Sequence, residues 1–446
     1  MADDPRFDST LARIQSDLGH SPVHVPGSAG PVPLASRTAT AELAWAGVAA
    51  ASLAAAEEPT TLVGLDPTRI AVAYSSDRYL RIDDAAPDVW SPMSGFFRTS
   101  DGWVRTHANY PHHAAALRGA LGLPADADRG ELAQVLAARP STASAHEVSA
   151  AGGLCVTVER ERPAVDASLR ETPLVRLGQI GPAAARVRPR ASEGLLLHGV
   201  RVLDLTRVIA GPVATRTLAL LGAEVLRIDP PGMAEPEWQH FDTGHGKTSA
   251  LLDIGGEPEH LHRLLDDADV VVLGYRPRAL DARGLSPAQL ADRHPGLVVA
   301  RLSAWGFDAA SADRRGFDSL VQAASGIAWI ESIDGETPGA LPAQALDHTA
   351  GYLLAAAVME LLRRQATTGG TWLAETSLRR IAAELLGMPR TDEPASVAPI
   401  ESAAHLQHFD VDGVRLTTAA PALSLGGKPL RYSAPGRWGR DDAEWL

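Results

Sequence analysis

The stretch that most constrains the fold of this chain is residues 199–232, GVRVLDLTRVIAGPVATRTLALLGAEVLRIDPPG. It predicts a strand, a loop, a helix and a second strand in close succession. Both strands are unbroken apolar runs, which is typical of parallel strands covered on both faces. We therefore expect a parallel sheet to begin here.

Strands and helices continue to alternate after this stretch. The segments KTSALLDI, DVVVLGY and LVVARLSAW are predicted strands, and PEHLHRLLDDA and SPAQLADRH are predicted helices between them. Such alternation favours an α/β fold with a Rossmann-like, doubly wound parallel sheet. A long helix that begins near Asp347 and ends at Gly369 and Gly370 follows.

The first part of the chain has a different texture. We expect a helix at about 39–57, short strands in TRIAVAYSSDRYLRID and DGWVRTHAN, and helices at about 111–121 and 129–138. A polar, Arg/Pro-rich linker at 183–194 separates it from the sheet. We predict a smaller α+β part at 1–190, a Rossmann-like part at 196–390, and a C-terminal tail at 391–446 that packs on the fold.

Composition excludes some classes of function. The 446 residues carry a net charge of -13 and no basic run, which argues against a nucleic-acid partner. Cys155 is the only cysteine, so no intrachain disulfide forms, as in a cytoplasmic protein. The Ala-rich run near residue 50 lies between glutamates and predicts a buried helix, not a membrane span. The histidines of HANYPHH lack a suitably spaced acidic partner, so we expect no metal.

The loop DLTRVIAGP follows the first strand of the predicted sheet. Ligands of open α/β sheets bind beyond the carboxyl ends of the strands. Gly211 allows close backbone approach, and Pro212 suits a first helical turn. The loop is therefore either a ligand cradle or an ordinary strand–helix turn.

Asp347 stands at the mouth of the long apolar helix. One interpretation is a helix cap, which stabilises by about 1 kcal/mol. The other is a nucleophile that attacks an activated carbonyl. In the second case, we expect the helix N-terminus to favour the ionised carboxylate.

Several motifs, in order, resemble the family III (CaiB/BaiF) CoA-transferases. They are residues 199–232 and then GHGKTSALLDI, ADVVVLGYRPRALDARGL, RHPGLVVARLSAWG, RRGFDSLVQAASG and QALDHTAGYLLAAAVMELLRR. Residues 99–124 and 151–181 resemble segments that follow the Asp helix in that family, yet here they precede the sheet. The family forms interlocked ring dimers, so the resemblance implies a homodimer.

The resemblance also implies a function. It is transfer of CoA from an acyl-CoA thioester to a carboxylic acid, with coenzyme A as substrate, no permanently bound cofactor, and Asp347 as the covalent nucleophile. The enzyme would then be a transferase of sulfur-containing groups (EC 2.8.3.-). The CoA-binding positions that the resemblance assigns are Arg207, Val208, Ile209, Ala210, Gly211, Lys247, Arg315 and Phe317, with Arg276 close enough to replace a missing phosphate contact.

Two alternatives remain open. Related α-methylacyl-CoA racemases have a histidine where this chain has Phe317, and phenylalanine cannot move a proton. His240, His245 or His348 would have to replace it.

The chain could also be a non-catalytic relative that binds CoA thioesters. The weak counterpart of the family's glycine-rich loop is SIDGETPGA, with Gly335 and Gly339.

Overall fold

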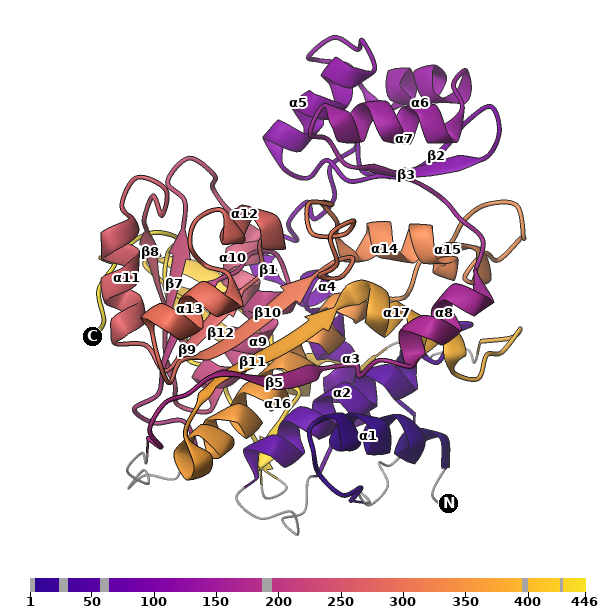
Figure 1. The fold of residues 1–446 in the computed structure, drawn as a ribbon. Helices are drawn as coiled ribbons and strands as arrows, with labels where there is room; N and C mark the ends of the chain where they lie inside the picture. Colours follow the sequence, from indigo (N-terminus) through magenta and orange to yellow (C-terminus); the bar gives the residue numbers. More distant parts are fainter. Residues whose placement is uncertain (1–4, 24–30, 57–63, 187–194, 395–399, 426–427) are drawn as a thin grey trace.

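A computed structural model describes residues 5–23, 31–56, 64–186, 195–394, 400–425 and 428–446. Its centre is a seven-stranded sheet (Figure 1). In spatial order the strands are β5 (Arg176–Gly181), β11 (Thr371–Ser377), β10 (Val298–Ser303), β9 (Val270–Leu273), β6 (Arg201–Leu205), β7 (Glu224–Asp229) and β8 (Lys247–Leu251).

All neighbouring strands of this sheet are parallel except β5, which runs antiparallel to β11 at the edge. The chain passes outward from β6 to β7 and β8, and then returns to β9 on the other side of β6. The carboxyl end of β6 is therefore a topological switch point. This large, mostly parallel sheet confirms the predicted α/β fold class.

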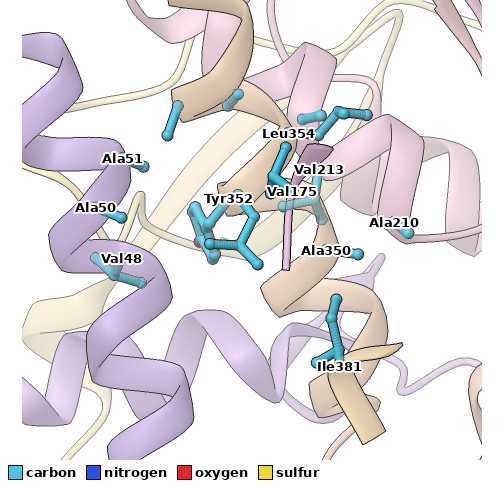
Figure 2. Packing of buried hydrophobic residues seen from close by; sticks show 14 of the residues in the cluster. Val48, Ala50, Ala51, Val175, Ala210, Val213, Ala350, Tyr352, Leu354 and Ile381 are labelled. Carbon is cyan, nitrogen blue, oxygen red and sulfur yellow. The ribbon is translucent and has the colours of Figure 1, made fainter. Parts of the chain in front are cut away.

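Helices cover both faces of the sheet (Figure 1). One face carries the largest hydrophobic core, with α16 (Ala345–Thr368) at its centre between α2 (Thr40–Ala55) and α9 (Ala210–Leu220). Figure 2 shows Val48 and Ala51 of α2 gathered around Tyr352 of α16. The other face carries α11 (Pro258–Asp266) and α13 (Pro287–Arg293), whose leucines form a second core.

A smaller α+β unit stands beside the sheet and has its own core (Figure 1, top). Its antiparallel strands are β2 (Gly95–Arg98), β3 (Trp103–Thr106) and β4 (Cys155–Thr157). Its helices are α5 (Pro111–Ala120), α6 (Arg129–Ala137) and α7 (Ser141–Ala150). We call residues 91–157 the small unit; its strands β3 and β4 pack on α14 (Asp318–Ser325) of the larger body.

The prediction of strands within TRIAVAYSSDRYLRID was wrong for most of this segment. It forms α3 (Pro67–Tyr74) and α4 (Ser76–Tyr79), followed by the two-residue strand β1 (Arg81–Ile82). The reason is local: the Asp66 side chain accepts hydrogen bonds from the backbone N–H groups of Thr68 and Arg69, at 2.9 and 3.2 Å. Proline at the first helical position completes this helix start.

The predicted division into parts at residues 190 and 391 stays a prediction, and residues 187–194 of the linker lie outside the described ranges. Helix α1 (Pro5–Asp17) and α2 pack in the largest core, and β5 joins the large sheet. The remaining elements are α8 (Pro163–Arg170), α10 (Glu237–Thr243), α12 (Pro277–Asp281), α15 (Ile327–Ile330), α17 (Leu378–Gly387), a 3-10 turn (Ala403–His405), β12 (Leu406–Val411), β13 (Val414–Ala419), β14 (Ser424–Leu425) and β15 (Lys428–Pro429). Among the helices of the described ranges, none is long and apolar enough to cross a membrane.

Candidate active site

The loop after β6 lies at the switch point and has a strained backbone. Val208 has a φ of 72°, a region that β-branched residues rarely adopt. Its backbone N–H donates to Glu235 Oε1 at 3.3 Å. A Cβ on Gly211 would lie 2.3 Å from the Cβ of Thr206, so only glycine fits. Strain of this kind costs about 1–3 kcal/mol and is concentrated at ligand-binding sites.

Lys247 holds this loop in place through hydrogen bonds. Its ammonium donates to Asp204 Oδ2 and to the carbonyl of Pro212, each at 3.0 Å. Burial lowers the pKa of Lys247 to about 8, although the Asp204 carboxylate opposes that shift. The side chain is almost wholly buried, so in this structure its charge holds the loop and does not face solvent.

Arg207 is held by an acidic residue that also binds the small unit. Its guanidinium donates to Glu235 Oε2 at 2.7 Å and lies over the ring of Tyr110, 5.0 Å from the centroid. Tyr110 donates its hydroxyl proton to Glu235 Oε1 at 3.1 Å. Arg227, which is fully buried, donates to Glu235 Oε2 at 3.1 Å and to Asp229. Glu235 thus joins the switch-point loop to the small unit.

Asp347 is buried, with 6% of the residue exposed. Asp347 is the third residue of α16. The N-cap position belongs to Gln344, whose side chain makes no capping hydrogen bond. The interpretation of Asp347 as the helix cap was therefore wrong. Its backbone N–H instead donates to Asp318 Oδ2 at 3.0 Å, so the carboxylate of another helix caps α16.

Asp318 and Asp347 form a pair of buried carboxyl groups. The amide of Gln322 donates to Asp318 Oδ1 at 2.5 Å, and its oxygen accepts from the backbone N–H of Leu341 at 2.9 Å. Burial raises the pKa of Asp318 to about 6, against the lowering effect of the backbone N–H of Asp347. Burial, followed by the charge of Asp318, raises the pKa of Asp347 well above its usual range.

The expectation that the helix N-terminus keeps Asp347 ionised was therefore wrong. The backbone N–H of Asp347 is already bonded to Asp318, and two buried carboxyl groups oppose each other's ionisation. The pair consequently holds a proton to a higher pH than an exposed carboxyl group does.

Gly351 brings Asp347's helix against the switch-point loop. A Cβ at Gly351 would lie 2.7 Å from the Ala210 carbonyl oxygen and 2.7 Å from the Cβ of Val213. The helix that carries Asp347 and the first turn of α9 are therefore in backbone contact. This contact brings two parts of the predicted site together, the loop 207–211 and Asp347.

Phe317 meets the small unit through stacked rings. Its ring lies 4.2 Å from that of His107 and 6.4 Å from that of Tyr110, both nearly parallel to it. His113 contacts it edge-on, at 6.1 Å. Burial lowers the pKa values of His107 and His113 to about 3, so both are neutral at pH 7.

Arg276 and Arg315 lie at the outer edge of the site. Arg276 forms an ion pair of 3.8 Å with Asp313. Burial and then the charge of Arg315 lower the pKa of Arg276. Arg315 is exposed and lines a cavity of about 360 Å³ together with residues of α7, β4 and Leu320.

The histidines considered for proton transfer are buried and contact backbone carbonyls or an aromatic ring. His240 and His245 contact the backbone carbonyls of Gly436 and Ser433, at 3.1 and 2.9 Å. His348 packs against Tyr74, with ring centroids 5.0 Å apart. Burial lowers the pKa of each of the three to about 3.

Sequence reasoning did not single out Asp318, Glu235 or Tyr110. Asp318 had a signal, because it follows Phe317 in the Gly-Phe-Asp triplet that was considered only for its missing histidine. Tyr110 had none, since it reaches Glu235 across 125 positions of sequence.

Comparison with known proteins gives matches for part of the chain. Residues 197–411 match the model of CoA-transferase family III. The chain is 32% identical over 212 residues to the probable fatty acyl-CoA transferase Rv3272 of Mycobacterium tuberculosis, covering 44% of this chain and 54% of the relative. It is 30% identical over 193 residues to (R)-2-hydroxy-4-methylpentanoate CoA-transferase of Clostridioides difficile, covering 39% and 48%.

A crystal structure of Rv3272 is similar to this chain with 32% identity and a TM-score of 0.41, over 43% of this chain and 56% of that one. A CaiB/BaiF family protein from Brucella suis has 23% identity and a TM-score of 0.39, over 50% and 65%. The chain spans about half the length of the curated relatives named above.

The sheet and its loop define a switch-point α/β protein, the class in which ligands bind beyond the carboxyl ends of the strands. Residues 197–411 match CoA-transferase family III, in agreement with the predicted resemblance. The resemblance of residues 99–124 and 151–181 to later family segments lies outside that match and stays a prediction.

Proposed function

We propose that this protein transfers CoA from an acyl-CoA thioester to a carboxylic acid, with Asp347 as the covalent carrier. The observation that carries the proposal is the buried carboxyl of Asp347, on a helix that touches the switch-point loop at Gly351 and Ala210. The match of residues 197–411 to family III and the names of the relatives, which are CoA-transferases, support it.

The proposed reaction begins when an Asp347 oxygen attacks the thioester carbonyl carbon. The carbon–sulfur bond breaks, CoA leaves as the thiolate, and an aspartyl anhydride remains. The thiolate attacks the Asp347 carbonyl and releases the donor acid, which leaves an aspartyl–CoA thioester. The acceptor carboxylate attacks the carbonyl carbon of this thioester, the carbon–sulfur bond breaks, and CoA leaves again as the thiolate, which gives a second anhydride. CoA thiolate then attacks the acceptor carbonyl, and Asp347 is restored as a carboxylate.

Burial suits this sequence of steps. Anhydrides and thioesters hydrolyse when water reaches them, and a water-poor site prevents that loss. We propose that the 207–211 loop holds CoA through its backbone, and that Arg276 and Arg315 meet the phosphates. Lys247 would act by holding the loop in place. A homodimer in a cytoplasmic setting remains part of the proposal.

The proposal is tested by incubating the protein with acyl-CoA donors and carboxylic acids, and separating the products by mass spectrometry. Addition of hydroxylamine should trap the activated carboxyl as a hydroxamate at Asp347, found by peptide mapping. Binding of CoA thioesters without any trapping or transfer would instead support a non-catalytic protein. Exchange of an α-proton in deuterated water would support a racemase, which Phe317 disfavours.

The carboxyl pair predicts how turnover depends on pH. Protonated Asp347 cannot attack, and its pKa is raised by burial and by the charge of Asp318, so turnover should still rise with pH above the usual pKa range of a carboxyl group. Replacing Asp318 with asparagine removes the charge that opposes ionisation of Asp347, so the acid limb of the pH–rate profile should move to lower pH.

The exposed carboxylate of Asp308 provides a matched control, because Asp308→Asn leaves the pair intact. An acid limb that stays in place in Asp318→Asn would contradict coupling between the two carboxyl groups. Thermal unfolding of the variant has to be measured as well. Asparagine has only one acceptor oxygen, so it cannot accept hydrogen bonds on two side-chain oxygens, as Asp318 does from the backbone N–H of Asp347 and the amide of Gln322.

A further inference from the structure

Helix α5 of the small unit begins with backbone donors that have no acceptor inside the helix. Its first residue, Pro111, has no N–H, and the first bond of the helix runs from the Ala114 N–H to the Tyr110 carbonyl at 3.0 Å. The N–H groups of His112 and His113 precede that bond, so the helix does not use them. Tyr110, at the N-cap position, makes no side-chain capping bond. The start of α5 therefore offers two N–H donors to a ligand.

His113 adds a polar atom without a partner at the same place. The residue is 8% exposed, and its Nδ1 is buried without a hydrogen bond in the part of the chain that the structure describes. Side chains of a helix point back toward its N-terminus, so this ring lies over the first turn of α5. When Nδ1 carries the proton of the neutral imidazole it is a donor, and an anion at the helix start would be its acceptor.

Two guanidinium charges act on this helix start. Arg207 lies over the ring of Tyr110, and the exposed His112 has its ring centroid 5.7 Å from that of the same tyrosine. Burial, followed by the charges of Arg207 and Arg315, lowers the pKa of His112. The acidic residue near Arg315 in sequence, Asp313, is engaged by other arginines, at 2.8 and 3.8 Å. The surroundings of the free N–H groups are therefore positive, which suits an anion.

Glu235 fixes the start of α5 against the switch-point loop. Its Oε1 accepts from the Tyr110 hydroxyl at 3.1 Å and from the Val208 backbone N–H at 3.3 Å. Its Oε2 accepts from Arg207 and Arg227, at 2.7 and 3.1 Å. The negative charge of Glu235 is therefore shared between two arginines. The helix start and the 207–211 loop lie on either side of this one carboxylate, so a single bound molecule can contact both.

We propose that the start of α5 binds a phosphate group of CoA, through the N–H groups of His112 and His113, the ring of His113 and the guanidinium of Arg315. A phosphate has enough acceptor oxygens for these donors, and the helix dipole favours its negative charge. None of the CoA-binding positions that the sequence resemblance assigns lies in the small unit, so this site is additional to the 207–211 loop. The inference rests on the proposed function, because it places a further part of the same substrate.

The first test is calorimetric titration of the whole chain with CoA, with dephospho-CoA, which lacks the phosphate on the ribose, and with pantetheine, which lacks every phosphate. In His112→Glu, a carboxylate at the helix start favours the helix through its dipole but repels a phosphate. This variant should bind CoA about tenfold or more weakly, and should bind pantetheine as the wild type does. Unchanged binding of dephospho-CoA identifies the ribose phosphate as the bound group, and weakened binding identifies the pyrophosphate.

Replacement of His113 should move stability and binding in opposite directions. His113→Leu replaces a buried polar group that lacks a partner with an apolar side chain, so its melting temperature should be close to or above that of the wild type. Its affinity for CoA should nevertheless fall about tenfold. His113→Asn keeps a donor near the position of Nδ1 and should recover part of that affinity. His112→Glu carries the test if His113→Leu does not fold.

Gln134→Glu is the matched control. Gln134 is exposed on α6 of the same unit, so this variant adds the same charge as His112→Glu without placing it at the start of α5. It should bind CoA, dephospho-CoA and pantetheine like the wild type.

The outcomes separate this inference from the proposed function. Wild-type affinity for CoA in both variants, or equal weakening of CoA and pantetheine in His112→Glu, overturns the phosphate site. Weaker binding of the acceptor acid with unchanged binding of CoA also overturns it, and assigns the helix start to the carboxylate of the acid. In each of these cases, CoA transfer by the wild type leaves the proposed function standing.

A phosphate-dependent loss of CoA affinity, in a protein that transfers CoA to no acid, supports the site and refutes the proposed function. Absence of CoA binding by the wild type refutes both.

Discussion

Replacement of Asp347 with asparagine is expected to lower turnover on the order of 10³-fold or more, because the proposed covalent step loses its nucleophile. CoA should bind with nearly unchanged affinity, since the proposed contacts to CoA come from the 207–211 loop and the outer arginines. Steady-state kinetics with an acyl-CoA donor, together with calorimetric titration of CoA, measures both quantities.

This variant should keep its fold. The asparagine side chain is neutral. Its introduction therefore removes the repulsion between the buried carboxyl groups of residues 318 and 347, which raises the pKa of Asp347 in the wild type. Its melting temperature at pH 7 should be equal to or above that of the wild type. The control is Asp128→Asn at the capped start of α6, in the small unit, which should keep its turnover. Turnover that persists in Asp347→Asn would refute the covalent role.

Replacement of Glu235 with alanine is expected to destabilise the protein by about 3–5 kcal/mol, because the buried Arg207 and Arg227 each lose one of their two carboxylate partners and keep only Asp229. Glu235 accepts from Arg207, Arg227, Tyr110 and the backbone of the strained Val208. Urea unfolding monitored by circular dichroism gives the free energy of unfolding. Loss of Glu235 should also weaken CoA binding, because the loop loses one of its supports.

Glu237, two positions further along the chain, is a suitable comparison. It is largely exposed and pairs with Arg437 at 3.2 Å, so Glu237→Ala should change the free energy of unfolding by about 1 kcal/mol or less. Similar losses in both variants would show that the buried network around Glu235 adds no special stability.

The sequence predicts much of the large sheet because several of its parallel strands are buried on both faces and read as apolar runs. β6, β9 and β10 are of this kind, and so the α/β fold and the place of the 207–211 loop follow from local pattern. The helix α3 was missed although Asp66 and Pro67 carry an ordinary helix start, because a short run of apolar residues between turns was taken for a strand.

The electrostatics of the site depends on contacts distant in sequence. Helix-end reasoning alone predicted an ionised Asp347, whereas Asp318, 29 positions earlier, takes its backbone N–H and opposes its charge. Likewise, the sequence predicts that Lys247 binds phosphates of CoA. In the fold, its ammonium instead donates to Asp204 and to the carbonyl of Pro212. Such partners become visible only when the chain is folded.

The backbone contact at Gly351 limits how the site can adapt. Since a Cβ at Gly351 would lie 2.7 Å from the Ala210 carbonyl oxygen, the spacing between α16 and the switch-point loop is set by main-chain contact and cannot be tuned by changing a rotamer. Under the proposed function, engineering of selectivity should therefore leave this contact intact and begin where strands β3 and β4 of the small unit pack on α14.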